Sequence, residues 1–206
     1  MATRRPLRPR KQPQQQRSKA LVDTLLDATA RILERSGLEE MSTNEIARVA
    51  GVSVGSLYQY FPSKEALVAA LIERKVELDF RELGEAVEKL RGAPFERLVA
   101  GVVRATLELH RRDRGLLRAL LELVPRMGRH AQVRQMAAQG RVGLRQLLEA
   151  HQAELRRVDL DIPTFIVGRL LEELAHAALF ERPELLEDPR FADEVTYLLV
   201  AYLRAC

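Results

Sequence analysis

The stretch that decides the fold reads TNEIARVAGVSVGSLYQYFPSKEALVAAL and covers residues 43–71. Counted from Thr43, a small residue follows four positions on at Ala47, a glycine eight on at Gly51 and a leucine fourteen on at Leu57. Two closely crossing helices need a small residue where they touch, and the tight turn between them needs a residue that tolerates positive φ. The spacing therefore predicts a helix-turn-helix over about residues 42–60, with Leu57 buried against the first helix.

Residues with capping side chains stand at the boundaries of both predicted helices. Ser42 and Glu45 fit a capping box, in which the serine oxygen and the glutamate carboxylate each accept a hydrogen bond from a backbone amide. Ser53 can cap the second helix in the same way. Spacing and capping are independent constraints, and both indicate the same two helices. The alternative is a packed helix pair that has no role in DNA binding.

The residues expected to contact DNA lie at the helix starts and along the exposed face of the second helix: Thr43, Asn44, Ser53, Val54, Gly55, Ser56, Tyr58, Gln59, Tyr60 and Lys64. Val54 and Gly55 could approach base edges, and the amide of Gln59 could pair with adenine. The tyrosine hydroxyls and Ser56 could bind phosphates, which position a protein without reading sequence. Lys64 could hold the DNA backbone just beyond the second helix.

Positive charge is concentrated at the N-terminus. Residues 53–60 contain no lysine or arginine, whereas residues 1–20 carry seven cations and no acid: Arg4, Arg5, Arg8, Arg10, Lys11, Arg17 and Lys19. The whole chain has a net charge of +4, so the other 186 residues carry a net −3. With three prolines and four glutamines in residues 1–16, we expect a disordered basic arm over 1–17 that binds the DNA backbone or minor groove. A solvated tail that only aids solubility is the alternative.

Residues 18–72 resemble the N-terminal domain of the tetracycline-repressor (TetR) family. That family pairs an I-A-x-x-A-G-V-S segment with L-Y-x-Y/H-F and then S-K-E-x-L, and the corresponding residues here are IARVAGVS, LYQYF and SKEAL. The resemblance implies base contacts from Val54, Gly55 and Gln59, and phosphate contacts from Thr43, Ser53, Tyr58, Tyr60 and Lys64. Position 60 is often histidine in the family and is tyrosine here, which leaves the operator sequence open.

Helical periodicity continues through the rest of the chain, and no strand pattern interrupts it. A first helix is expected from about Ser18 to a left-handed cap at Gly37, and a long helix after Pro62-Ser63. Further helices are expected over 95–111, 114–124, 130–156, 162–181 and 188–205. The sequence predicts an all-α protein, in which a three-helix helix-turn-helix domain over 18–64 is joined by a long helix to a helical regulatory and dimerisation domain, the two together spanning 18–206.

The resemblance implies that residues 65–206 form a homodimer. A symmetric dimer doubles the DNA contact and fixes the spacing of the two half-sites. Apolar stripes on the last two predicted helices suit such an interface, although they also suit an ordinary core: Phe165, Ile166, Leu170, Leu174, Ala178, Phe191, Val195, Leu198 and Tyr202.

A small-molecule site is also expected in this region. Polar side chains among apolar ones could orient a ligand, and the candidates are Thr106, His110, Met127, Phe165, Glu173 and His176. For a histidine on such a helix, a hydrogen-bonded structural role is the alternative. The four histidines have no metal-binding spacing, so no metal or cofactor is expected.

Other functional classes find little support. The sequence contains no phosphate-binding glycine loop, no nucleophile elbow and no carboxylate cluster, which argues against an enzyme. No 18-residue apolar run and no signal segment occur, and the single cysteine is Cys206, so a cytoplasmic protein is expected. We therefore expect a homodimeric repressor that a small molecule releases from a palindromic operator. A non-specific architectural DNA protein, or a regulator without a ligand, is the alternative.

Overall fold

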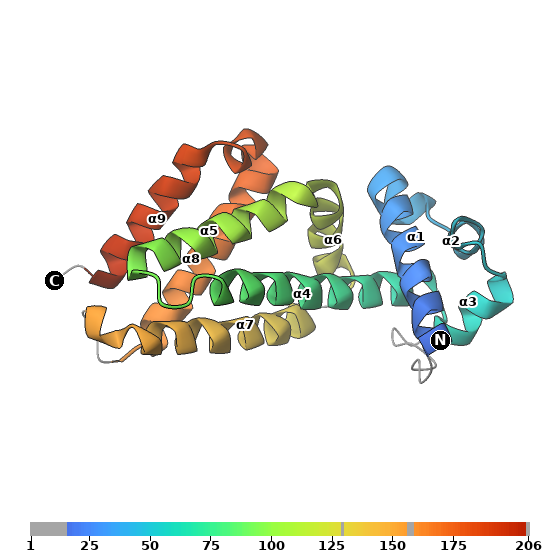
Figure 1. The fold of residues 1–206 in the computed structure, drawn as a ribbon. Coiled ribbons are helices and arrows are strands. Elements are labelled where there is room, and N and C mark those ends of the chain that lie inside the picture. Colours follow the sequence, from blue (N-terminus) through green and yellow to red (C-terminus); the bar gives the residue numbers. More distant parts are fainter. Residues whose placement is uncertain (1–15, 129, 156–158, 205–206) are drawn as a thin grey trace. The chain divides into compact units, whose positions relative to one another are not determined.

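The structure, a computed structural model, describes residues 16–128, 130–155 and 159–204. These residues contain no strand and form nine α-helices and two short 3-10 helices (Figure 1): α1 (Gln16–Glu40), α2 (Thr43–Ala50), α3 (Val54–Tyr60), α4 (Lys64–Glu88), α5 (Phe95–Arg112), α6 (Arg114–Arg126), α7 (His130–Ala150), η1 (Gln152–Glu154), α8 (Asp161–Glu181), η2 (Pro183–Leu186) and α9 (Pro189–Arg204). The all-α class expected from the sequence is confirmed. The basic arm expected over residues 1–17 lies almost entirely outside the described residues.

The chain divides into two compact units. The first contains the described residues up to Glu77 together with 115–128, so α6 groups with α1, α2, α3 and the first half of α4. The second contains residues 78–114 and the described residues after Arg129, which form the end of α4, α5 and α7 to α9. The long helix α4 is continuous from one unit into the other, as the sequence predicts.

The first unit is built around α1, which packs on α2 as α2 packs on α3. Its core holds fully buried aliphatic and aromatic side chains from all four N-terminal helices and the turns between them: Leu25, Ile32, Leu33, Met41, Ile46, Leu57, Phe61, Leu67 and Leu71. Each such side chain contributes about 1.5–3 kcal/mol by leaving water. Arg74 of α4 also pairs with Asp27 of α1 at 2.7 Å. These contacts position α2 and α3 on a rigid base.

The end of α1 differs from the expected left-handed cap. Gly37 has φ 71° and ψ 179°, and the chain then continues in helical turns to Glu40. This conformation is accessible essentially to glycine alone, but it is not the left-handed helical one, whose ψ lies near +47°. The first helical stretch therefore ends at Gly37, as the sequence predicts, and a second short one follows it across a kink.

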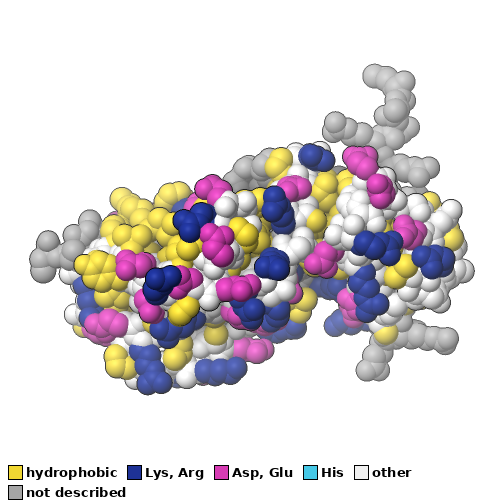
Figure 2. All heavy atoms as spheres, turned by 90° about the horizontal axis from the view of Figure 1, so that it is seen from above, with side chains coloured by type: hydrophobic (Ala, Val, Ile, Leu, Met, Phe, Trp, Pro, Cys, Tyr) yellow, Lys and Arg dark blue, Asp and Glu magenta, His cyan; other side chains and the backbone are white. Residues whose placement is uncertain are grey.

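The second unit packs α5 against α8 and α9, and α7 against α8. Its core contains apolar side chains that recur at three- and four-residue spacing on these helices: Phe95, Leu98, Val103, Leu107, Leu148, Val167, Ala175, Leu179, Val195, Leu199 and Leu203. On the face drawn in Figure 2, hydrophobic side chains lie between basic and acidic ones. No helix in the described part of the chain is long and apolar enough to cross a membrane.

The helix ends beyond residue 94 lie close to their predicted positions, with two differences. α7 ends at Ala150 rather than near residue 156, and a 3-10 turn over Gln152–Glu154 follows it. α6, expected to end at residue 124, extends to Arg126 with Pro125 inside its last turn. A proline there removes only one amide donor, so the helix can still close its final turn.

Candidate DNA-binding site

The turn between α2 and α3 has the geometry that the spacing predicts. Gly51 adopts φ 68° and ψ 30°, and its amide lies within hydrogen-bonding distance of the carbonyl of Arg48 at 3.2 Å. The amide of Val52 donates to the carbonyl of Ala47 at 3.0 Å. Ala47 and Leu57 are buried, at 1% and 0% exposed. The small residue, the left-handed glycine and the buried leucine thus perform the roles assigned to them from the sequence.

Both predicted helix caps are present, although one half of the capping box is absent. The hydroxyl oxygens of Ser42 and Ser53 accept hydrogen bonds from the amides of Glu45 and Ser56, at 3.2 and 3.0 Å. The carboxylate of Glu45 pairs with the guanidinium of Arg35 on α1 instead of returning to the Ser42 amide. The ion pair adds a link between α1 and α2 that local spacing does not reveal.

The structure brings most of the predicted DNA contacts together on one accessible surface. Gly55, Tyr58 and Gln59 are exposed along α3, and Val54 and Ser56 are half-buried beside them. The hydroxyl of Tyr58 lies 3.0 Å from that of Thr43 at the start of α2, so the two helices present adjacent hydroxyls. Asn44 and Ser53 are exposed at the two helix starts. This surface carries uncharged donors and acceptors and one valine.

Tyr60 and Lys64 have partners inside the unit. Tyr60 is 8% exposed, and its hydroxyl donates to the hydroxyl of Ser18 at 3.1 Å. The ammonium of Lys64 donates to the carbonyls of Leu38 at 2.7 Å and Met41 at 3.1 Å. A cation beside the last carbonyls of a helix is favourable because those groups have no intrahelical donor. Both side chains therefore support the fold of the unit as it stands.

Arg48 is a cation of this segment that was not predicted to contact DNA. Arg48 is the only lysine or arginine between Ser42 and Phe61, and it is exposed in the last turn of α2. Its position as the single positive charge in the helix-turn-helix is the signal that could have singled it out. Phosphate affinity from this segment can come from Arg48, whereas α3 itself has no charge to supply.

The residues proposed for a ligand do not form a single group. His110 of α5 and His176 of α8 are close, with ring centroids 5.3 Å apart, and Nδ1 of His110 lies 2.8 Å from the carbonyl of Thr106. Glu173 is exposed and pairs with Arg169, and Phe165 is 56% exposed. Met127 belongs to the first unit. An open groove between α5 and α9 is lined by other residues, among them Ala100, Tyr197 and Val200.

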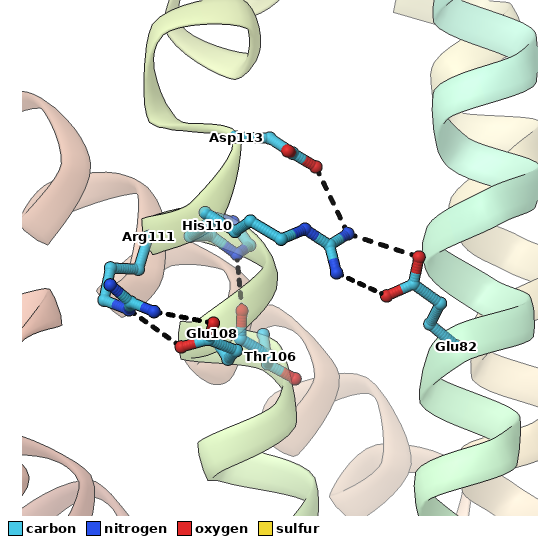
Figure 3. A network of polar contacts seen from close by, with 7 residues as sticks. Glu82, Thr106, Glu108, His110, Arg111 and Asp113 are labelled. Atoms are coloured by element: carbon cyan, nitrogen blue, oxygen red, sulfur yellow. Dashed lines mark hydrogen bonds and ion pairs between the residues drawn. The ribbon is translucent and has the colours of Figure 1, made fainter.

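A network of charged side chains lies at the end of α5, close to where the chain passes into α6 (Figure 3). The guanidinium of Arg112 forms two hydrogen bonds with Glu82 of α4, at 2.8 and 3.2 Å, and a third with Asp113 at 3.3 Å. The bonds to Glu82 raise the pKa of Arg112 above its usual range. Neighbouring Arg111 lowers the pKa of Glu108 through its own hydrogen bonds. Within the second unit, this network fixes the end of α5 to α4.

His176 gives the second unit a dependence on pH. Burial lowers the pKa of His176; the nearby Glu173 raises it by less, and Arg169 lowers it further. The unfolded chain therefore binds this proton more readily, so the associated stability is complete above about pH 6.5 and is lost as the pH falls below it. We expect the melting temperature to fall less between about pH 7.5 and pH 5.5 for His176→Gln than for the unmodified chain. If the melting temperatures of the variant and the unmodified chain fall equally over this pH range, His176 is not the source of the pH dependence.

The residues predicted for a dimer interface fall into three groups by exposure. Phe165, Ile166 and Leu198 are exposed, and Leu170, Leu174, Phe191 and Tyr202 are half-buried. Ala178 and Val195 are 3% exposed each and belong to the core of the second unit. Two further apolar side chains on the same helices, not predicted from the sequence, are also exposed: Ile162 of α8 and Tyr197 of α9. Among the described residues, no cluster of histidine, cysteine and acidic side chains could hold a metal ion.

The patterns of two known protein families match this chain. The pattern of the bacterial regulatory proteins of the tetR family matches residues 25–71, which include all of α2 and α3. The pattern of the tetracyclin repressor-like C-terminal domain matches residues 94–203, more than half of the chain. The chain belongs to the tetR family. The family resemblance seen in residues 18–72 is thereby confirmed.

Individual transcriptional regulators are similar to this chain over shares of its length that differ from one to the next. The transcriptional regulator UidR of Escherichia coli K12 is 26% identical over 186 residues, which cover 88% of this chain and 92% of UidR. The transcriptional repressor KstR of Mycolicibacterium smegmatis is 37% identical over 75 residues, or 36% of each chain. The crystal structure of a TetR-family regulator from Streptomyces coelicolor shares the fold with a TM-score of 0.63 and 23% identity, covering 90% of this chain and 96% of that one. The chain is therefore a DNA-binding regulator of transcription and not an enzyme.

Proposed function

We propose that this tetR-family protein is a cytoplasmic homodimeric repressor that binds a palindromic operator and that a small molecule releases. The exposed surface of α3 carries the proposal for DNA, since it presents Gly55, Tyr58 and Gln59 on a rigidly capped helix. The similarity to KstR, a transcriptional repressor, supports repression. In this proposal residues 18–64 form the DNA-binding domain, and 65–206 form the regulatory and dimerisation domain.

The individual DNA contacts divide by chemistry. We assign base contacts to Val54, Gly55 and Gln59, because valine methyl and glutamine amide groups can contact base edges in the major groove and a glycine lets the backbone approach them. Phosphate contacts fall to the hydroxyls of Thr43 and Tyr58, which are adjacent, and to the exposed helix-start residues Asn44 and Ser53. Lys64 contributes by fixing the end of α1, because its ammonium is already held by backbone carbonyls.

Exposed apolar side chains on α8 and α9 support the homodimer. Ile162, Phe165 and Leu198 are 63%, 56% and 45% exposed, which is a large apolar surface for one chain to leave in water. Pairing two such helix pairs by a twofold axis would cover this surface and set two copies of α3 on successive half-sites. The second unit would also receive the ligand, between α5 and α8, where His110 and His176 meet.

The proposal predicts that Phe165→Asp separates the dimer and weakens operator binding. A carboxylate that loses its water in an interface without a partner costs about 3 kcal/mol or more, which corresponds to at least about 100-fold weaker association. The matched control is Val142→Asp on α7. Val142 is 58% exposed, close to the 56% of Phe165, but lies outside the proposed interface. Sedimentation and footprinting on selected DNA give the readout. A dimeric Phe165→Asp protein, or protection of a single half-site by the unmodified chain, would contradict the proposal.

The ligand-release part has its own test. A molecule that binds the second unit raises its melting temperature by mass action, and a true effector also lowers operator affinity. A small-molecule library is therefore screened for thermal stabilisation, and each hit is added to the operator complex. Stabilising hits that leave the complex intact would count against release by ligand.

A further inference from the structure

We propose that Tyr60 is a positioning residue for the N-terminal basic arm, acting through its hydrogen bond to Ser18. The inference rests on the proposed function, because it assumes that the arm contributes to operator binding. It assigns the hydroxyl of Tyr60 to a bond within the protein, whereas Tyr58 keeps its hydroxyl for DNA. The bond would then set the point, relative to the recognition helix α3, from which the cations of the arm reach the DNA next to each half-site.

The geometry of the two tyrosines separates their roles. Tyr58 is 37% exposed, and its hydroxyl lies at the surface beside that of Thr43. Tyr60, the last residue of α3, is 8% exposed and donates to Ser18, 42 residues earlier in the chain. The part-buried hydroxyl of Tyr60 donates its one proton to Ser18, so in this arrangement it has no proton left to donate to a phosphate oxygen. Only one of the two hydroxyls is therefore available to DNA in this conformation.

The position of Ser18 links this bond to the arm. Ser18 lies in the first turn of α1, which begins at Gln16, so the bond fixes the point where residues 1–15 join the helix. An extended chain spans at most about 3.3–3.6 Å per residue. From Gln16, Arg10 can thus reach about 20 Å and Arg4 about 40 Å, and one turn of DNA is about 34 Å long. Cations tethered at this point stay near the DNA that flanks the bases contacted by α3.

A fixed tether raises the effective concentration of the arm at one place on the DNA. If the tether point moves, the same cations sample more space, and fewer phosphates are neutralised at any moment. The salt dependence of operator binding reports this number directly, because each neutralised phosphate contributes about −0.9 to the slope of log K against log salt concentration. A purely structural role for Tyr60 would change stability without changing this slope.

The test is a double-mutant cycle on the full chain with selected operator DNA. Tyr60→Phe is measured alone and together with an arm-neutral variant, in which Arg4, Arg5, Arg8, Arg10 and Lys11 are all replaced by glutamine. We expect Tyr60→Phe to weaken binding about fivefold, as expected for one net hydrogen bond, and to make the salt slope shallower. In the arm-neutral background we expect no further loss. Ser18→Ala should reproduce both results, which provides a second variant should Tyr60→Phe fold poorly.

Tyr58→Phe is the matched control, and it should weaken binding equally in both backgrounds because its hydroxyl contacts DNA without the arm. Equal losses from Tyr60→Phe in both backgrounds would overturn the inference, since they would place its hydroxyl on DNA. Full affinity and an unchanged slope in Ser18→Ala would overturn it as well. If the arm-neutral variant keeps the slope of the unmodified chain, the inference fails while the proposed function stands. If the unmodified chain protects no operator, the proposed function itself fails.

Discussion

Leu57→Ala is expected to destabilise the first unit by about 2–5 kcal/mol and to abolish operator binding at physiological temperature. Leu57 is 0% exposed on α3, and α2, which packs on α3, holds the buried side chains of Ile46 and Ala47. Truncation removes the apolar contact and leaves a cavity that neighbouring side chains fill only in part. Because α3 has only seven residues, it has little helical stability of its own and depends on this packing.

Urea denaturation of the full chain, followed by circular dichroism, measures the loss. The two compact units can unfold in separate transitions, in which case only the one that reports the first unit should shift. The matched control is Gln59→Ala, because Gln59 is exposed on the same helix. This substitution should change the free energy of unfolding by no more than about 0.5 kcal/mol. A Leu57→Ala cost below about 1 kcal/mol would mean that other contacts hold α3.

The arm-neutral variant is expected to have the largest effect on the salt dependence of DNA binding. Five cations are removed from a segment that carries no acid, whereas α3 has no charge to compensate for them. If all five neutralise phosphates, the slope of log K against log salt becomes shallower by up to about 4.5. Between about 50 and 200 mM salt, the unmodified chain would then lose up to about 500-fold more affinity than the variant.

Fluorescence anisotropy with labelled operator across a salt series measures both slopes. Arg97→Gln is a suitable control, because Arg97 is an exposed cation of α5 in the second unit. It should leave the slope unchanged, so that a general effect of net charge is separated from an effect of the arm. Parallel salt series for the arm-neutral and unmodified chains would instead support the reading of the arm as a solubilising tail.

The family, the fold class and the helix-turn-helix were all accessible from the sequence. Ala47, Gly51 and Leu57 act over at most fourteen residues, and the caps at Ser42 and Ser53 act over three. Such short-range requirements are written into local spacing, since helix geometry fixes which residues meet. The predicted helix boundaries from residue 95 onward follow from the same periodicity.

The candidate regulatory sites were less accessible. His110 and His176 lie on two different predicted helices, and only the packing of α5 on α8 brings their rings to a centroid distance of 5.3 Å. Ala178 and Val195 share a stripe with exposed residues in sequence, yet they are buried in the core of their own chain. An apolar stripe specifies that a face is covered but not whether the same chain or a second copy covers it.

By itself, the sequence determined that this protein is an all-α tetR-family regulator with a helix-turn-helix over residues 42–60. The tertiary structure decided the partners of that motif: Glu45 pairs with Arg35, Lys64 binds the carbonyls at the end of α1, and Tyr60 donates to Ser18. It also assigned α6 to the first unit. The physical reason is range, because local periodicity specifies which face of a helix is buried, whereas a hydrogen bond across 42 residues exists only once the helices have packed.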